Sequence, residues 1–102
     1  MNVANLQLEG LIMAVAAMSR LLVEKGVLTS DEIDQTLRRT EASLTGEERN
    51  EEDLSPAHRD AVCFPIRFLL LANSMQAQGR TPAFSELTKL VGRTKGHYND
   101  QM

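Results

Sequence analysis

Residues able to carry out covalent or metal chemistry are few in this sequence and lie far apart. There is one cysteine, Cys63, and there are two histidines, His58 and His97. A metal site needs histidine, cysteine or carboxylate ligands that converge at short helical or loop spacings, and these residues do not. No serine or cysteine stands in a glycine elbow, and no glycine-rich phosphate loop is present. We therefore predict a non-enzymatic protein without catalytic, metal-binding or cofactor-binding residues.

The tripeptide His58-Arg59-Asp60 also occurs in the catalytic loop of protein kinases. In those enzymes an asparagine follows several residues later, and a glycine-rich loop and an Asp-Phe-Gly triplet complete the site. This sequence has none of these three features, and its 102 residues are far too few for a kinase domain. We interpret the tripeptide as a coincidence.

Cys63 lies in the apolar sequence Ala-Val-Cys-Phe-Pro-Ile. Burial among such neighbours raises the pKa of a thiol and makes it unreactive. A single cysteine cannot form a disulfide within the chain, and this usage is typical of a reducing compartment. We expect a structural thiol and a cytoplasmic protein.

The composition favours helices over strands. Hydrophobic residues make up 42% of the chain but aromatic residues only 4%, and tryptophan is absent. A core must therefore be built from leucine, alanine, valine, isoleucine and methionine, a mixture that suits helix packing better than a β-sandwich. The length fits one domain, 1–102. The predicted fold class is all-α, a four- to five-helix orthogonal or bundle-like domain.

Apolar spacing and capping signals place the helices. Along the first helix, apolar residues recur at spacings of three and four: Leu8, Leu11, Ile12, Val15, Met18 and Leu22. Gly26 is placed to end this helix, and Thr29 with Glu32 forms a capping box at the start of the next. The expected elements are helices at 5–25, 30–43, 56–78 and 82–91, an acidic linker at 45–54 and a polar C-terminal tail at 93–102.

The third helix is expected to be the hydrophobic centre of the fold. Ser55 and Pro56 are a cap residue and a proline at the first helical position, and Gly79 is placed to end the helix. Pro65 lies inside it and predicts a kink or a break. Apolar residues cover most of its circumference, so other helical surfaces must enclose it.

The chain offers one long amphipathic helix and two shorter ones to cover the third helix. We expect that these are too few and that a second subunit covers part of its apolar surface. Each large apolar side chain that a partner covers contributes roughly 1.5–3 kcal/mol. Several of them outweigh an association cost of about 4–15 kcal/mol. We predict a homodimer, with a compact monomeric bundle or a different protein partner as the alternatives. The expected contact residues are Leu8, Leu11, Val15, Phe64, Phe68 and Leu71.

No membrane partner is expected from the first helix. Its uninterrupted apolar run, Leu11 to Met18, is too short to span a bilayer. Glu9 precedes this run, and no lysine or arginine stands before it to form the positive start of a signal peptide. The sequence therefore predicts a soluble protein.

The two halves of the chain differ in charge. Acidic residues predominate in 1–55 and basic residues in 56–102, within a net charge of −3. An acidic half and a basic half can meet across an intramolecular or intersubunit contact. A polyanion-binding C-terminal half is the alternative interpretation.

Residues 84–98 resemble the DNA-binding helix-turn-helix, in which a short helix ends at a glycine and a capped second helix enters the major groove. Leu87, Val91 and Tyr98 take the packing positions, and Gly92 takes the turn. The resemblance implies that four residues contact DNA: Arg93, Thr94, Lys95 and His97. A small DNA-binding regulator is therefore the alternative to a non-enzymatic interaction or structural protein.

Overall fold

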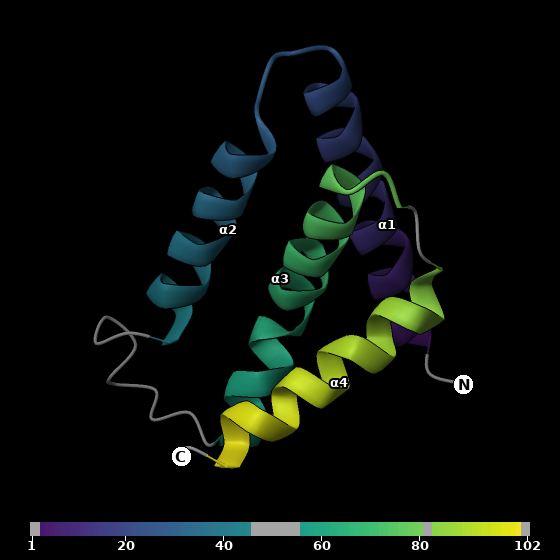
Figure 1. The fold of residues 1–102 in the computed structure, drawn as a ribbon. Helices are drawn as coiled ribbons and strands as arrows, with labels where there is room; N and C mark the ends of the chain where they lie inside the picture. Colours follow the sequence, from purple (N-terminus) through teal and green to yellow (C-terminus); the bar gives the residue numbers. More distant parts are fainter. Residues whose placement is uncertain (1–2, 46–55, 81–82, 101–102) are drawn as a thin grey trace.

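The computed structural model describes residues 3–45, 56–80 and 83–100, without the side chains of 56–57 and 93–100. Within these ranges it contains four helices and no strand. They are α1 (Val3–Glu24), α2 (Ser30–Thr45), α3 (Pro56–Ala77) and α4 (Phe84–Asp100) (Figure 1). The predicted all-α fold is confirmed, and no fifth helix is found in the described ranges.

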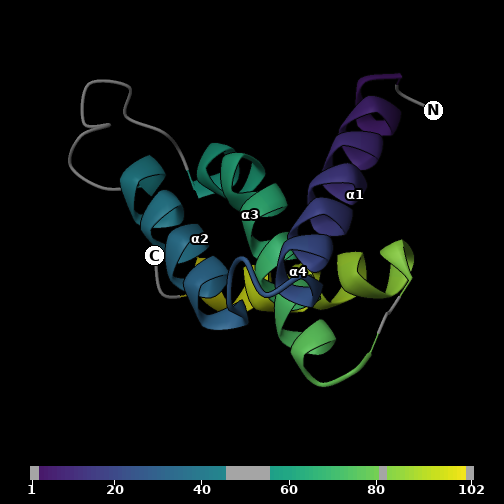
Figure 2. The same ribbon diagram turned by 90° about the horizontal axis from the view of Figure 1, so that it is seen from above.

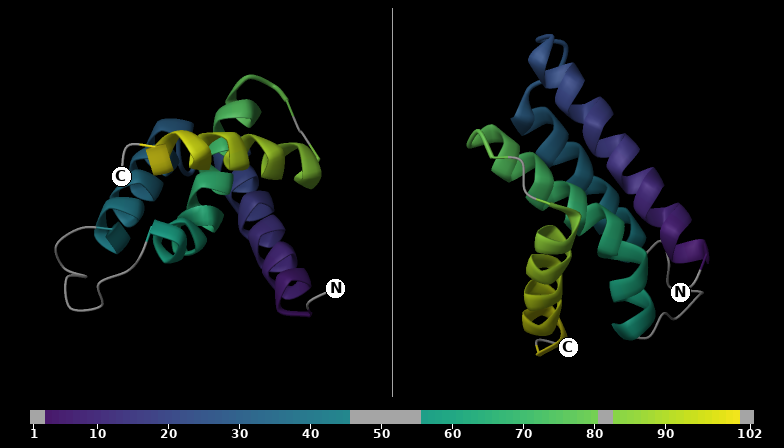
Figure 3. Two further views of the ribbon diagram at one scale, coloured as in Figure 1. Left: turned by 90° about the horizontal axis from the view of Figure 1, so that it is seen from below. Right: turned by 90° about the vertical axis from the view of Figure 1, so that its right-hand side faces the viewer.

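Helix α3 is the centre of the fold, and each of the other three helices packs on it. In Figure 1, α2 lies along one side of α3, α1 lies on its other side and α4 crosses its lower part. Figure 2 and Figure 3 show that the first turns of α1 point away from the other three helices. The N-terminal half of α1 is therefore the part of the fold with the fewest neighbours.

The core lies where α1 and α4 meet α3. Phe68 of α3 is fully buried, with 0% of its surface exposed. Ile12 of α1 and Leu87 and Val91 of α4 complete the buried cluster around it. The centroid of the Phe68 ring lies 4.9 Å from that of Phe84. The three other helices thus all pack on the apolar third helix within one chain, while cover by a second subunit remains a prediction.

Helices α1 and α3 both end at a glycine, as predicted. Gly26 has a φ of +74° and Gly79 a φ of +79°, a left-handed conformation that residues with a Cβ rarely adopt. In α1, the N–H of Val27 donates to the carbonyl of Leu22, and the N–H of Gly26 donates to the carbonyl of Val23, both at 3.0 Å. An equivalent pair of bonds ends α3. These are Schellman motifs, which use carbonyls that the helix itself leaves unpaired.

The predicted capping box begins α2. The N–H of Thr29 donates to Oε1 of Glu32 at 2.8 Å, and the N–H of Glu32 donates to Oγ1 of Thr29 at 3.0 Å. Asn73 of α3 adds a tertiary contact, because its Nδ2 donates to the carbonyl of Ser30 at 2.9 Å. The start of α2 is therefore set locally by its own sequence and held against α3 by Asn73.

Pro65 does not interrupt α3. The helix runs from Pro56 to Ala77 with Pro65 inside it, so the predicted break is absent, while a kink remains a prediction. Proline removes one backbone donor and clashes with the preceding turn. Buried neighbours on both sides of it, Cys63 and Ile66, hold this part of the helix against the rest of the chain.

The predicted end of the last helix at Gly92 was wrong. Helix α4 starts at Phe84 and continues through Gly92 to Asp100, so residues that we expected to form a polar tail are helical. Glycine costs an interior helical position about 1 kcal/mol relative to alanine, which is too little to end a helix held by packing. Leu87 and Val91, each 2% exposed, provide that packing on the turns before Gly92.

The other boundaries agree with the prediction within two residues. Thr45 belongs to α2 rather than to the acidic linker, and the rest of that linker, 46–54, lies outside the described residues. The predicted cap at Ser55 lies outside them as well.

Candidate functional site

The apolar surface of the described chain is concentrated on α1. Its exposed large hydrophobic side chains are Val3, Leu6, Leu8, Leu11, Met13, Val15, Met18 and Leu21, followed by Val27 in the next turn. No such exposed side chain occurs on the described parts of the other helices. Ile12 is the one residue of α1 that is buried. An exposed apolar surface this continuous typically marks a contact with a protein, a ligand or a membrane.

The exposed side chains of α1 fall on two faces. Leu8, Leu11, Val15 and Met18 recur at helical spacing on one face, which we call the outer stripe. Val3, Leu6, Gly10, Met13, Ala17 and Leu21 recur at helical spacing on the other, which we call the groove stripe. A helix with two apolar faces and one buried residue needs more cover than the other three helices provide.

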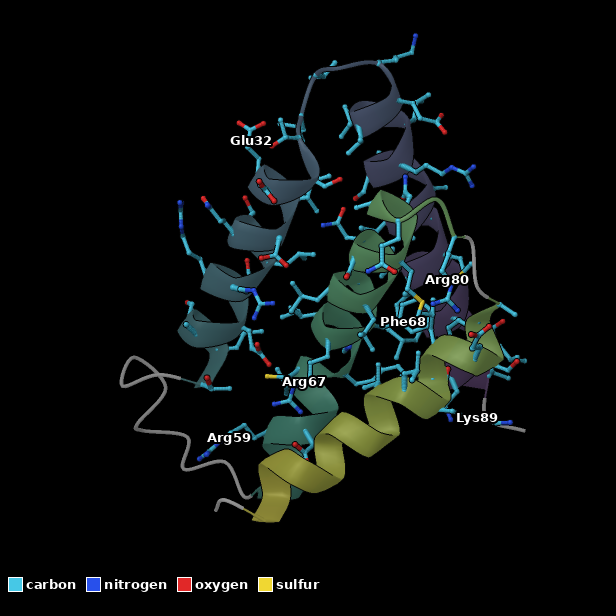
Figure 4. The ribbon with its side chains drawn as sticks, viewed as in Figure 1. Glu32, Arg59, Arg67, Phe68, Arg80 and Lys89 are labelled. Atoms are coloured by element: carbon cyan, nitrogen blue, oxygen red, sulfur yellow. The ribbon has the colours of Figure 1, made fainter. Side chains whose placement is uncertain are left out.

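The groove stripe borders a hollow between α1, α3 and α4. This groove has a volume of about 360 Å³. Its apolar wall consists of Met13, Ala17 and Leu21 from α1, Phe68 and Ala72 from α3, and Leu87 from α4. Figure 4 shows Phe68 between α3 and α4, with Arg80 close to it at the end of α3. The volume lies within the range of about 300–1,000 Å³ that is usual for binding pockets.

Charged side chains stand at the edge of the groove. Nε of Arg20 lies 3.1 Å from Oε2 of Glu24, one turn later on α1. A terminal nitrogen of Arg80 lies 3.4 Å from Oε2 of Glu86 on α4. All four side chains are about half exposed, so water screens these pairs and each contributes little to stability. Their charges are thus available to an incoming partner.

The best-buried charged cluster of the described chain is on the far side of α3. Nε of Arg67 donates to Oε2 of Glu41 at 2.7 Å, and its terminal nitrogen donates to Oδ1 of Asp60 at 3.0 Å. Burial by itself lowers the pKa of the Arg67 guanidinium, but the hydrogen bonds to Glu41 and Asp60 raise it above its ordinary value. Figure 4 shows Arg67 on α3 facing α2. The cluster joins two helices and is not open to a substrate.

Asp60 and Cys63, two residues singled out by sequence for their chemistry, are both buried in the described chain. Asp60 of the His-Arg-Asp tripeptide is 4% exposed and bound to Arg67. Cys63 is a free, fully buried thiol, and burial raises its pKa above the ordinary value of 9.0, although the nearby Arg67 charge opposes this. Among the described residues, no three histidine, cysteine or carboxylate side chains lie close enough to hold a metal ion.

The expected contact residues are divided between surface and core. Leu8 and Val15 are each 37% exposed and Leu11 is 62% exposed, as a contact surface requires. Phe64 and Leu71 are partly buried against the core of their own chain. Phe68 has 0% exposure and belongs to the core of its own chain, and it also borders the groove. The sequence shows which face of α3 is apolar but not which helix covers it.

The expected DNA-contacting residues lie on the C-terminal part of α4. Its backbone is helical there, but the side chains of Arg93, Thr94, Lys95 and His97 lie outside the described ones. The helix-turn-helix resemblance requires a turn at Gly92, and α4 is continuous through that residue. The backbone therefore lacks the feature that suggested the motif.

By length and composition, α1 could also cross a membrane. Its most apolar 18-residue window has a mean hydropathy of 1.6, and 6% of that window is buried. A signal sequence or the core helix of a soluble protein has the same length and composition. The prediction of a soluble, cytoplasmic protein remains a prediction.

Sequence reasoning did not single out the groove. Its polar edge comes from Arg20, within an otherwise apolar helix, and from Arg80, directly after the glycine that ends α3. The sequence features that could have indicated the groove were these two charged residues beside apolar stretches. Only the packing of α1 on α3 brings them to the same hollow.

The fold and the groove together define a small helical domain with an apolar contact surface. Comparison with known proteins adds no family: no family model, no curated protein and no solved structure matches the chain.

Proposed function

We propose that this chain is a non-enzymatic helical interaction protein that acts as a homo-oligomer, most simply a two-fold dimer, and that α1 provides the contact surface. One observation carries this proposal. In the described chain, every exposed large hydrophobic side chain belongs to α1 or to the turn after it.

The energetics favour covering this surface. Complete burial of a leucine, valine or methionine side chain stabilises by roughly 1.5–3 kcal/mol, and the half-exposed side chains of α1 retain about half of that gain. Eight such side chains are exposed on α1. Both copies contribute to a dimer, so covering even one apolar face of each α1 is comparable with the association cost of about 4–15 kcal/mol.

The first test is the mass of the protein in solution. Light scattering during gel filtration at tens of micromolar should give about twice the chain mass of 11.3 kDa. A mass of 11.3 kDa at this concentration would contradict the proposal.

The second test asks whether α1 is the contact surface. The double variant Leu6→Glu, Leu11→Glu adds one charge to each apolar face of α1, and it should convert the dimer into a folded monomer. The double variant Gln35→Glu, Ser43→Glu adds the same charge at exposed positions of α2 and serves as the matched control. A control that dissociates equally well would mean that net charge, rather than α1, governs assembly.

A lipid membrane is the alternative partner for the apolar surface of α1, because α1 has the length and composition of a membrane-crossing helix. Flotation of the protein with zwitterionic phosphatidylcholine vesicles distinguishes dimerisation from membrane binding. The dimer should stay with the soluble fraction. Flotation of the wild-type protein together with loss of flotation in the Leu6→Glu, Leu11→Glu variant would overturn the homo-oligomer proposal in favour of membrane association.

The DNA-binding alternative is tested separately. A labelled random duplex at low salt should show an anisotropy shift that falls steeply as salt rises, if Arg93, Lys95 and His97 contact phosphates. We expect no shift at micromolar protein, because the turn that suggested the motif is replaced by continuous helix.

A further inference from the structure

We propose that the groove between α1, α3 and α4 is the docking site for the N-terminal half of α1 from the second copy, with the two α1 helices antiparallel. This inference rests on the proposed dimer and names the face of α1 that forms it. The groove stripe is then the contact and the outer stripe is not.

The groove stripe has two halves with different roles. Met13, Ala17 and Leu21, in its C-terminal half, form the α1 wall of the groove. Val3 and Leu6, in its N-terminal half, are 65% and 50% exposed on the turns that point away from the other helices (Figure 2). The C-terminal half of the groove stripe therefore lines the groove, and its N-terminal half is apolar and uncovered.

The two halves match in length. At about 1.5 Å per residue, Val3 to Met13 spans about 15 Å and the α1 wall of the groove from Met13 to Glu24 spans about 16 Å. A two-fold axis near Met13 therefore lays each N-terminal half along the partner's wall. The same surface is used by both copies, as an isologous interface requires.

The side chains along this face complement one another in the antiparallel arrangement. With the axis between Met13 and Ala14, Leu6 lies opposite Leu21 and Gly10 lies opposite Ala17 of the other copy. Leu6 and Leu21 form a large apolar pair, and the small pair of Gly10 and Ala17 lies between them and the axis. Two helices approach closely where both carry small residues, so the register is compatible with tight packing.

Gly10 has no role within its own chain. It lies in the interior of α1, where glycine costs about 1 kcal/mol relative to alanine. A Cβ at Gly10 would meet no atom of this chain within 4 Å, and its φ is not left-handed. A glycine at this position allows a second helix to approach this face closely.

The charges of α1 are self-complementary in the same register. Glu9 is the one charged residue between Val3 and Ser19, and it lacks an ion-pair partner in the described chain. Arg20 lines the groove on the same flank of the helix. An antiparallel pair brings Glu9 of each copy beside Arg20 of the other, so the contact occurs twice per dimer. A parallel pair would instead place the two Glu9 side chains on opposite edges of the interface, each about 16 Å along the helix from the nearest Arg20.

The first experiment compares two leucines on neighbouring turns. Leu6→Glu should raise the dissociation constant of the dimer at least tenfold, because Leu6 lies on the groove stripe. Leu11→Glu adds the same charge at a position that is more exposed, 62% against 50%, and should change the constant less than threefold. The reverse ranking would assign the dimer to the outer stripe and overturn this inference.

Gly10→Leu separates docking from folding. A leucine at Gly10 favours helix formation and should raise the melting temperature of the single chain. It should also raise the dimer dissociation constant at least tenfold, because it blocks the approach to Ala17 of the other copy. A variant that gains stability and still dimerises as the wild type does would overturn the close approach at Gly10.

A charge exchange tests the register. Glu9→Arg and Arg20→Glu should each weaken the dimer by roughly 5- to 30-fold, and the double variant should regain most of the wild-type affinity. Arg38→Glu breaks a comparable exposed pair with Asp34 on α2 and should leave the dimer unchanged. Losses that simply add in the double variant would contradict the antiparallel register.

Oxidative cross-linking completes the test. Met13→Cys, next to the proposed axis, should form a disulfide-linked dimer, while Met18→Cys should not, although Met18 is more exposed, 64% against 39%. Native Cys63 is fully buried and does not compete. A wild-type mass of 11.3 kDa refutes the dimer itself. A wild-type dimer that links through Met18→Cys refutes only the groove docking.

Discussion

Arg67 and Glu41 form the tightest link between two helices in the described chain. Nε of Arg67 on α3 donates to Oε2 of Glu41 on α2 at 2.7 Å, and the two side chains are 10% and 20% exposed. The same guanidinium binds Asp60, two turns earlier on the same face of α3. A single side chain thus neutralises two carboxylates that would otherwise face a poorly hydrated interior.

Replacing Arg67 should destabilise the fold. Arg67→Met keeps the apolar stem of the side chain but leaves Asp60 and Glu41 without their cation, and we expect a loss of about 3–5 kcal/mol. Urea unfolding followed by circular dichroism measures this. The triple variant that adds Asp60→Asn and Glu41→Gln should regain part of the loss, because it removes the unpaired charges. A loss below 1 kcal/mol in Arg67→Met would show that the cluster is well hydrated.

Replacing Phe68 should destabilise the single chain in addition to altering the groove that it borders. Phe68 is fully buried beside Phe84, so Phe68→Ala opens a cavity and should cost about 3–5 kcal/mol. Thermal unfolding of the dimer and of the Leu6→Glu, Leu11→Glu monomer measures it. The Leu6→Glu, Leu11→Glu monomer should already show this cost. A cost confined to the dimer would return Phe68 to the contact surface.

Replacement by alanine should change the free energy of unfolding in opposite directions at two glycines. Gly92 lies inside α4 with open space where a Cβ would stand, so Gly92→Ala should stabilise by about 1 kcal/mol. Gly79 has a φ of +79°, so Gly79→Ala should destabilise by about 1 kcal/mol. Both are measured by chemical unfolding. Destabilisation by Gly92→Ala would mean that α4 turns there in solution.

The Cys63 thiol should make stability depend on alkaline pH. Burial raises its pKa above 9.0, so the folded chain keeps the proton at a pH where the unfolded chain releases it. The stabilisation is complete below about pH 9 and is lost as the pH rises through the folded pKa. The unfolding free energy should therefore fall between about pH 8 and pH 10 more steeply in the wild type than in Cys63→Ala. Equal slopes would contradict the raised pKa.

Helix identity and helix ends follow from local sequence. Thr29 and Glu32 bond to each other's backbone, and Gly26 and Gly79 adopt left-handed conformations, through contacts within a few residues. Such contacts need no knowledge of the rest of the chain, so the boundaries of α1, α2 and α3 could be predicted. The apolar circumference of α3 likewise predicted a central, enclosed helix.

Tertiary packing decided the features that sequence reasoning missed. Gly92 looks like a helix end in isolation, but Leu87 and Val91 anchor α4 on α3 and carry the helix past it. Phe68 and Leu11 are both apolar residues on apolar faces, yet Phe68 is fully buried and Leu11 is 62% exposed. Burial depends on which helix lies opposite, and that is a property of the assembled chain. The sequence by itself determined where the helices are, because hydrogen bonds and caps act over one or two turns. Only the crossing of α4 over α3 and the divergence of α1 decided where the groove and the uncovered surface lie.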